Sequence, residues 1–351
     1  MKVLFVFGTR PEGIKMAPII KEIEKRNNIE SYTCVTGQHR EMLDQVLEIF
    51  DIKPDYDLNI FKNGQSLTDV TTKTLQGLEK ILDELKPDIL LVQGDTTTVF
   101  AAALAAFYKK IKIGHVEAGL RSGNLYSPYP EEANRKLTGV IANYHFAPTN
   151  SNKENLLREG YDEKNIFITG NTVIDALKYS VKEDFVFDDE ILNNLDYNKD
   201  VVLLTAHRRE NWGEPMENIF SSIRRVVLER ENLEVVFPIH LNPIVRNTAK
   251  KYFSDLDRVH MIEPLSYMPF SNLMSRVKFV VTDSGGVQEE APALGKPVLV
   301  LRNETERMEG VKAKTAKLVG TDSKNVYENI IKLLDDKKLY DQMAKAVNPY
   351  G

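Results

Sequence analysis

Acidic, basic and hydroxyl side chains follow the short apolar runs of this sequence, where the strands of a parallel sheet would end. In open α/β sheets the ligand binds at these carboxyl ends. The residue types combine carboxylates, guanidinium groups, an imidazole and a glycine-rich turn, which indicates acid–base chemistry on a ligand that carries phosphate. The segments are residues 8–12 (GTRPE), 94–98 (GDTTT), 117–121 (EAGLR), 205–210 (TAHRRE) and 282–290 (TDSGGVQEE).

Three carboxylates are the candidates for proton transfer. Asp95 and Glu117 end two strands that are expected to be neighbours, and Glu131 begins a predicted helix. Carboxylates that converge on one rim push their pKa values apart, so that one can serve as an acid and another as a base. Arg135 lies one turn after Glu131 and is expected to pair with it. Helix capping or a surface ion pair is the alternative interpretation of each acid taken singly.

A phosphate-binding turn is predicted at Ser284, Gly285 and Gly286, before a helix that is expected to run to about residue 294. The two glycines let the backbone approach a ligand closely, and the free N–H groups at a helix start attract anions. Glu290 lies one and a half turns later, where its carboxylate can accept both ribose hydroxyls. A tight strand-to-helix turn with Ser284 as the capping residue is the alternative.

Basic residues and histidines complete the candidate site. Arg10 follows the first predicted strand, with Lys15 about one turn further, and both are placed to meet phosphate unless they are solvated surface residues. His207 ends a strand in the second half of the chain and is interpreted as a contact to the leaving group or sugar, with a structural hydrogen bond as the alternative. His240 is a weaker candidate of the same kind.

No cofactor or metal site is predicted. Gly13 is not followed by Lys-Ser or Lys-Thr, so there is no Walker loop, and the absence of Gly-x-Gly-x-x-Gly gives no support for NAD. The six histidines lack a metal-ligand spacing such as His-Glu-x-x-His. Two Asp-x-Asp matches, at residues 55–57 and 255–257, are interpreted as solvated loops.

The elements that must position these residues alternate short apolar strands with amphipathic helices, which predicts an α/β fold with parallel sheets covered on both faces. The alternation runs twice, from residues 3–7 onward and again from residues 201–204 onward. We expect two Rossmann-like domains that face each other across a cleft, residues 1–182 and 201–351. The acid- and asparagine-rich residues 183–200 are interpreted as the linker.

Composition excludes several classes of protein. The 351 residues carry a formal charge of −5 without a basic tract, so no nucleic-acid partner is expected. No apolar run reaches the roughly 18 residues of a membrane helix. Cys34 is the single cysteine and cannot form an internal disulfide, which favours a reducing compartment. The chain is therefore expected to be cytoplasmic.

Taken together, the motifs resemble the non-hydrolysing UDP-N-acetylglucosamine 2-epimerases over nearly the whole chain. The segments that carry the resemblance are residues 6–12, 37–43, 94–97, 115–121, 130–135, 170–175, 207–211 and 284–290. The resemblance implies the glycosyltransferase-B fold, a homodimer, and interconversion of UDP-N-acetylglucosamine and UDP-N-acetylmannosamine without a cofactor.

The resemblance also implies roles for individual residues. Catalytic or substrate-binding positions match Lys15, Asp95, Glu117, Glu131 and His207. The resemblance implies contacts to UDP from Arg10, Ser284, Gly285, Gly286 and Glu290. It also places Phe270 beside the uracil and makes Arg307 a further contact.

Two departures from the family accompany this match. Relatives usually continue into a last helix that returns to the first domain, so a tail beyond Gly351 is expected. Bacterial relatives bind a second substrate molecule as an activator, and Gln38, Arg208 and His240 match that site, but Glu41 and Gly64 stand where those relatives often have other polar or basic side chains.

Three rival activities remain open. A hydrolysing epimerase would release UDP and N-acetylmannosamine, a glycosyltransferase of the same fold would need an acceptor site, and a sensor would bind the UDP-sugar unchanged.

Overall fold

The computed structural model describes residues 1–38 and 40–351, and His39, which belongs to one of the family motifs, lies outside the described residues. The chain forms two compact units. Unit 1 comprises Met1–Tyr179 together with Tyr350–Gly351, and unit 2 comprises Ser180–Pro349.

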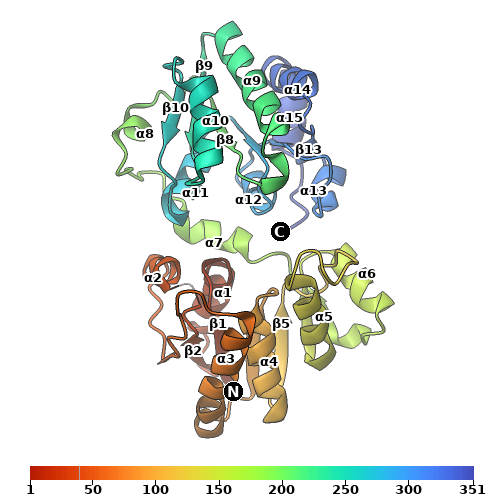
Figure 1. Ribbon diagram of the computed structural model, residues 1–351. Coiled ribbons are helices and arrows are strands. Elements are labelled where there is room, and N and C mark those ends of the chain that lie inside the picture. Colours follow the sequence, from red (N-terminus) through yellow and green to blue (C-terminus); the bar gives the residue numbers. More distant parts are fainter. Residues whose placement is uncertain (39) are drawn as a thin grey trace. The chain divides into compact units, whose positions relative to one another are not determined.

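Unit 1 contains a seven-stranded parallel sheet in the order β3-β2-β1-β4-β5-β6-β7 (Figure 1). The strands are β1 (Lys2–Phe7), β2 (Glu30–Val35), β3 (Tyr56–Asp57), β4 (Ile89–Gln93), β5 (Lys112–Val116), β6 (Tyr144–Ala147) and β7 (Ile166–Ile168). The helices are α1 (Arg10–Ile23), α2 (Arg40–Ile49), α3 (Leu67–Leu85), α4 (Thr97–Tyr108), α5 (Glu131–Ile141), α6 (Asn150–Arg158) and α7 (Val173–Ser180), with a 3-10 turn, η1 (Glu163–Asn165). Contacts group α1 with α2, and α4 with α3 and α5. Right-handed crossovers place these two groups on opposite faces of the sheet.

Unit 2 repeats this plan with six parallel strands in the order β10-β9-β8-β11-β12-β13. The strands are β8 (Asp200–Thr205), β9 (Leu233–Pro238), β10 (Val259–Ile262), β11 (Phe279–Thr282), β12 (Val298–Val300) and β13 (Ala316–Leu318). The helical segments are α8 (Glu190–Asn194), η2 (Arg209–Asn211), α9 (Glu214–Glu229), α10 (Pro243–Phe253), α11 (Tyr267–Arg276), α12 (Val287–Ala293), α13 (Met308–Lys312), α14 (Ser323–Asp335) and α15 (Lys337–Ala344). Residues 183–200, interpreted from the sequence as a linker, belong to unit 2 and contain α8.

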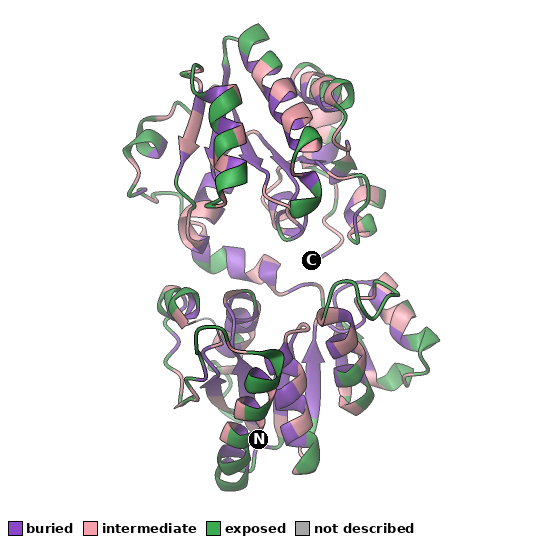
Figure 2. Ribbon diagram, viewed as in Figure 1, coloured by how far each residue is buried: buried purple, intermediate pink, exposed green. Residues whose placement is uncertain are grey.

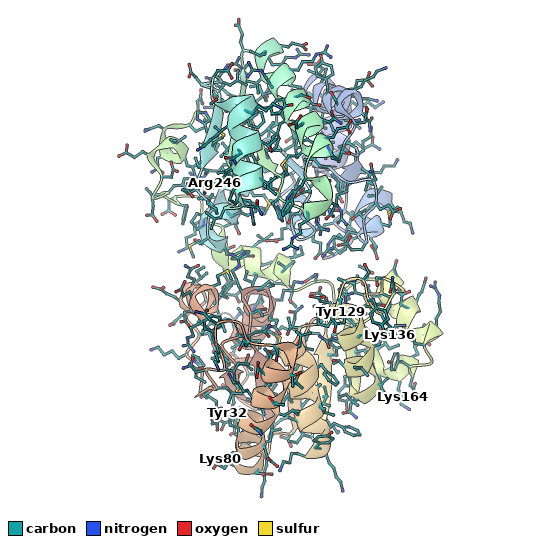
Figure 3. The ribbon with its side chains drawn as sticks, in the orientation of Figure 1. Tyr32, Lys80, Tyr129, Lys136, Lys164 and Arg246 are labelled. Carbon is teal, nitrogen blue, oxygen red and sulfur yellow. The ribbon has the colours of Figure 1, made fainter. Side chains whose placement is uncertain are left out.

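The central strands are apolar along their whole length because helices cover both faces of each sheet. Residues 3–7 of β1 and 201–204 of β8 are at most 2% exposed (Figure 2). Charged side chains such as Lys80 and Lys164, labelled in Figure 3, lie on the exposed surfaces of the helices and turns. These observations confirm the predicted α/β class with a parallel sheet in each unit. No helix among the described residues is both long and apolar enough to cross a membrane.

Candidate functional site

Each sheet has one topological switch point, and the candidate residues gather there. In unit 1 the chain leaves β1 toward β2 but leaves β4 toward β5, so the loops after β1 and β4 separate in opposite directions. In unit 2 the same reversal occurs between β8 and β11. A crevice at such a reversal is where doubly wound sheets bind ligands. The four loops carry Arg10, Asp95, His207 and the turn at residues 284–286.

Glu117 and Lys15 form an ion pair at the carboxyl edge of the unit 1 sheet. Lys15 projects from α1, Glu117 follows β5 directly, and the amide of Gln93 also donates to Oε2 of Glu117, at 2.5 Å. Glu117 has a φ of +65°, a left-handed conformation that is uncommon outside glycine. Such backbone strain at a strand end is typical of functional positions.

Asp95 and the loop that carries it are held by groups from two other segments. Its Oδ2 lies 2.6 Å from Nη2 of Arg135, and its carbonyl accepts a hydrogen bond from Asn134 at 2.9 Å. His115 supports the same loop, because its Nε2 lies 2.7 Å from the carbonyl oxygen of Gly94. Burial lowers the pKa of His115 to about 4, so the ring is neutral at pH 7 and donates this bond.

The predicted pairing of Arg135 with Glu131 is wrong. Arg135 contacts Asp95 and, at 3.1 Å, the fully buried carboxylate of Glu132. On a helix, residues 131 and 132 are both close enough to residue 135 to pair with it. Glu132 is the partner because its buried carboxylate is also held in place by bonds from the backbone N–H groups of Ser122 and Gly123. Glu131, at the first position of α5, makes no hydrogen bond or ion pair with the residues that the structure describes.

Glu12 joins the loops on both sides of the unit 1 switch point. One carboxylate oxygen accepts bonds from the backbone N–H groups of Gly8 and Thr9, at 3.1 and 2.7 Å, and the other accepts from the hydroxyl of Thr96 at 2.8 Å. Burial raises the pKa of Glu12 to about 7, although these hydrogen bonds oppose the rise. Arg10 begins α1 beside this carboxylate, and its guanidinium makes no hydrogen bond or ion pair with the described residues.

Charged side chains border the glycine-rich turn of unit 2, where a phosphate would bind. α12 begins after Gly286, and the Ser284 hydroxyl does not cap it, which removes the interpretation of Ser284 as a capping residue. The guanidinium of Arg307 lies over Gly285, where an added Cβ would be 2.7 Å from Nη1. Glu289 fixes that guanidinium through a bond to Nε at 2.6 Å.

Glu290 and α11 lie on one side of this turn. The carboxylate of Glu290 approaches Gly286, whose added Cβ would be 3.3 Å from Oε1. Burial and the neighbouring Glu290 raise the pKa of Tyr267, at the start of α11, above its ordinary range. Phe270 is half-buried one turn further along the same helix.

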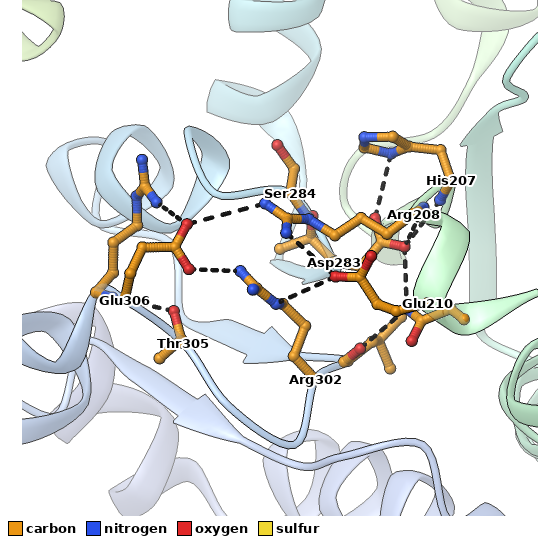
Figure 4. A network of polar contacts seen from close by, with 12 residues as sticks. His207, Arg208, Glu210, Asp283, Ser284, Arg302, Thr305 and Glu306 are labelled. Atoms are coloured by element: carbon orange, nitrogen blue, oxygen red, sulfur yellow. Dashed lines mark hydrogen bonds and ion pairs between the residues drawn. The ribbon is translucent and has the colours of Figure 1, made fainter. Parts of the chain in front are cut away.

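His207 and the buried carboxylate of Asp283 form a pair across the unit 2 switch point (Figure 4). One oxygen of Asp283 accepts from the backbone N–H groups of His207 and Arg208, at 2.8 and 2.9 Å, and from the amide of Asn211 at 3.1 Å. The other oxygen lies 3.2 Å from Nδ1 of His207. Burial raises the pKa of Asp283, but these bonds outweigh that effect and hold the pKa below its usual value.

Alternating charges surround the same loops. Arg208 contacts Glu210 at 3.2 Å, Arg302 contacts Glu306 at 3.0 Å, and Glu306 also pairs with Arg307 (Figure 4). Burial raises the pKa of Glu306, yet the arginines Arg307, Arg302 and Arg208 outweigh it and bring the pKa to about 2. The network neutralises the arginines in part while holding them beside the turn.

The three residues that match the activator site are divided between the units. Gln38 belongs to unit 1 and accepts a bond from the Thr98 hydroxyl at 2.9 Å. Arg208 and His240 belong to unit 2, where the ring of His240 stacks on that of His207 with 5.6 Å between centroids. The activator role remains a prediction.

No metal centre is formed by the described part of the chain, where no three His, Cys, Asp or Glu side chains are grouped to hold an ion. The two Asp-x-Asp segments are engaged otherwise, since Asp57 pairs with Arg40 and Asp255 pairs with Arg224.

Sequence reasoning missed Glu12, Glu132 and Asp283 as parts of the site. All three are buried carboxylates within a few residues of a predicted site residue. A buried acid needs partners. Only Asp283 follows an apolar run, so only that residue carried a local signal, and some partners of each acid come from other segments, such as Thr96 for Glu12 and Ser122 for Glu132.

Comparisons with known proteins place the chain in a family. The family model described as UDP-N-acetylglucosamine 2-epimerase matches residues 21–351. The UDP-N-acetylglucosamine 2-epimerase of Bacillus subtilis (strain 168) is 57% identical over 351 residues, covering 100% of this chain and 92% of the relative.

Solved structures give the same result. The crystal structure of UDP-GlcNAc 2-epimerase from Neisseria meningitidis bound to UDP-GlcNAc matches with a TM-score of 0.89 and 52% identity, over 100% of this chain and 96% of that one. The Methanocaldococcus jannaschii UDP-GlcNAc 2-epimerase in complex with UDP-GlcNAc and UDP matches with a TM-score of 0.77 and 36% identity, with the same coverage.

Proposed function

Because the chain belongs to the UDP-N-acetylglucosamine 2-epimerase family, we propose that it interconverts UDP-N-acetylglucosamine and UDP-N-acetylmannosamine without hydrolysing them. The observation that carries the proposal is the division of chemistry between the two switch points. Unit 1 offers Asp95, Glu117 and Glu131 for proton transfer, whereas unit 2 offers the glycine-rich turn and Arg307 for a diphosphate.

The chemistry requires the leaving group to depart first. The hydrogen on carbon 2 of the sugar is not acidic, so direct removal by a carboxylate would be far too slow. Cleavage of the bond between carbon 1 and the UDP oxygen places positive charge on the ring, and the carbon 2 proton can then pass to a carboxylate. The fragments are UDP and 2-acetamidoglucal, and UDP adds back to carbon 1 after carbon 2 receives a proton on its other face.

The site residues are proposed to supply the two stabilising effects that this path needs. Arg10, Arg307 and the backbone N–H groups of residues 284–286 stabilise the departing diphosphate. His207 contacts the diphosphate or nearby sugar hydroxyls. Glu290 binds the ribose, and Phe270 lies beside the uracil.

The carboxylates of unit 1 are proposed to exchange the proton at carbon 2 on both faces of the ring. Lys15 and Arg135 hold two of them through the ion pairs with Glu117 and Asp95. We further propose that the enzyme works in the cytoplasm as a homodimer and needs neither a metal nor an organic cofactor.

Proton NMR of the reaction in heavy water tests the proposal in one experiment. We expect the recovered UDP-N-acetylglucosamine and UDP-N-acetylmannosamine to carry one deuterium at carbon 2, with no loss of rate in EDTA. Accumulation of free N-acetylmannosamine and UDP would instead identify a hydrolysing epimerase. Binding of UDP-N-acetylglucosamine without isotope exchange would identify a sensor, and a requirement for nicotinamide would also overturn the mechanism.

A further inference from the structure

Three hydrogen bonds to one carboxylate oxygen fix the orientation of Asp283. It is fully buried behind the unit 2 switch point, and one of its oxygens accepts three hydrogen bonds, from the backbone N–H groups of His207 and Arg208 and from the Asn211 amide. Asn211 is itself buried, and its amide also donates to the carbonyl oxygen of Leu301 at 3.2 Å. The carboxylate therefore has one orientation, in which its second oxygen faces the imidazole.

The backbone of His207 is fixed, and its imidazole is constrained at one edge and on one face. Its backbone N–H is bonded to Asp283, its Nδ1 edge lies 3.2 Å from Oδ1 of that residue, and the ring of His240 stacks on one face at an interplanar angle of 15°. The side chain is nevertheless 39% exposed, and Nε2 makes no hydrogen bond with the described residues. The accessible atom is therefore Nε2.

We propose that Asp283 is a positioning residue that holds the proton of neutral His207 on Nδ1, so that Nε2 is the atom presented to the departing diphosphate. Oδ1 of Asp283 is buried, can only accept a hydrogen bond and has no hydrogen-bond partner among the described residues, so Nδ1, 3.2 Å away, is the nitrogen that must carry the proton to satisfy it. When the ring is doubly protonated, Nε2–H can give its proton to the diphosphate oxygen as the bond to carbon 1 breaks, which leaves the neutral Nδ1–H ring, and Nε2 takes the proton back from that oxygen when the bond re-forms. The contact to diphosphate rests on the proposed function, whereas the tautomer does not.

The tautomer can be measured directly in the full chain. Long-range proton–nitrogen NMR of protein labelled with 15N-histidine distinguishes a protonated Nδ1 from a protonated Nε2, and the His207→Asn spectrum assigns the signal. We expect the Nδ1–H form for His207 in the unliganded protein at a pH where the ring is neutral. The Nε2–H form would overturn the proposal, whatever the enzyme does to its substrate.

Asp283→Asn should reverse the tautomer. The amide oxygen must occupy the position that accepts three N–H bonds, which turns the NH2 group toward Nδ1 and forces the ring proton onto Nε2. We expect turnover to fall about 10²–10⁴-fold, the range for loss of a positioned proton-transfer group, while KM for the UDP-sugar stays within threefold.

A double-mutant cycle separates this role from general destabilisation. If Asp283 acts through His207, the double variant D283N/H207N should be no slower than H207N alone. Multiplicative losses would contradict the proposal. Because D283N could fold poorly, its thermal midpoint and UDP affinity are measured beside the kinetics, and the wild-type tautomer stands as a test that needs no variant at this position.

Glu234 supplies a matched control. It is a second buried carboxylate in unit 2, its Oε2 lies 2.8 Å from Nε2 of His260, and it lies near the start of β9, at the opposite edge of the sheet from the switch-point loops. Glu234→Gln should leave turnover within twofold. If wild-type protein shows no isotope exchange at carbon 2, the proposed function fails while the tautomer result is unaffected.

Discussion

Cationic side chains contact two of the three candidate carboxylates but not the third, so mutations of the three are expected to differ in their effects. Lys15 pairs with Glu117 and Arg135 pairs with Asp95, so each of these carboxylates is held by a fixed partner. Glu131 makes no ion pair with the described residues and lies at the start of α5, where the helix dipole favours negative charge. Mutation of each of the three should therefore lower turnover for the same chemical reason, whereas the effect on stability should differ among them.

Asp95→Asn, Glu117→Gln and Glu131→Gln should each lower kcat about 10²–10⁴-fold if the residue transfers a proton. UDP affinity, measured by calorimetry, should stay within threefold because the expected UDP contacts are mainly in unit 2. Glu154→Gln, which removes an exposed pair with Arg158, serves as the control and should be neutral. Losses below tenfold at all three acids would remove this assignment.

Glu12 predicts a pH dependence of stability. Its pKa rises from the usual 4.5 to about 7 in the folded protein because the group is buried. Between these two values the folded state keeps the proton and the unfolded chain releases it. The free energy of unfolding therefore falls as the pH rises from about 4.5 through about 7, by up to roughly 3 kcal/mol.

Glu12→Gln isolates this effect because glutamine imitates the protonated acid. Its amide oxygen can accept from the N–H groups of Gly8 and Thr9, and its NH2 group can donate to the hydroxyl of Thr96. Urea denaturation at pH 5 and pH 8 should show wild type losing stability relative to the variant at the higher pH. An equal difference at both values would show that Glu12 does not titrate in this range.

At the scale of elements, the segment from β5 to α5 depends on two glycines with different surroundings. Gly119 and Gly123 both have positive φ, +89° and +81°. A Cβ at Gly119 would lie 2.3 Å from the carbonyl oxygen of Asn152 in α6, whereas a Cβ at Gly123 would meet nothing within 4 Å. A substitution at either position therefore strains the backbone, but only a substitution at Gly119 also causes a steric overlap.

Gly123→Ala should cost about 1 kcal/mol of unfolding free energy, the strain term alone. Gly119→Ala should cost about 2–5 kcal/mol, because the overlap with α6 adds to that strain. Urea midpoints of the two variants measure the difference. Equal losses would mean that α6 shifts freely and does not fix the loop after Glu117.

Glu132 anchors the exposed loop of residues 122–129, in which Tyr129 is 63% exposed (Figure 3). Glu132→Gln turns one NH2 group toward an N–H donor and removes the charge beside Arg135. We expect a loss of about 2–4 kcal/mol, somewhat below that of a broken buried pair, because Arg135 keeps Asp95. Limited proteolysis should cut this loop faster than in wild type, while an unchanged cleavage rate would show that Glu132 does not hold it.

The strands and their carboxyl-end loops could be predicted from sequence because their signals are local. An apolar run such as residues 3–7 buries both faces, and Ser66 with Asp69 caps α3 as the capping pattern indicates. The pairing of Arg135 could not be predicted, since residues 131 and 132 are both within reach on a helix. Asp283 faces His207 only because β8 and β11 pair in register, Thr205 beside Thr282, which no local pattern encodes.

At the scale of the whole molecule, unit 2 is an insertion between residues 179 and 350 of unit 1. Composition alone indicated residues 183–200 as a linker, but composition does not indicate where the chain returns to unit 1. Tyr350 and Gly351 belong to unit 1 again. Tyr350 is buried in unit 1, and its carbonyl oxygen accepts a hydrogen bond from the N–H of Asn171 at 2.6 Å.

Tyr350→Ala should therefore destabilise unit 1, although the residue is remote in sequence from the rest of that unit. Loss of a buried aromatic side chain is expected to cost about 3 kcal/mol, and hydrogen exchange at Asn171 should accelerate. Val347→Ala is the matched control, because Val347 lies three residues earlier, belongs to unit 2 and is 84% exposed. UDP affinity should survive both changes, since the expected UDP contacts are mainly in unit 2. If Tyr350→Ala left hydrogen exchange at Asn171 unchanged, Tyr350 would contribute nothing to the stability of unit 1.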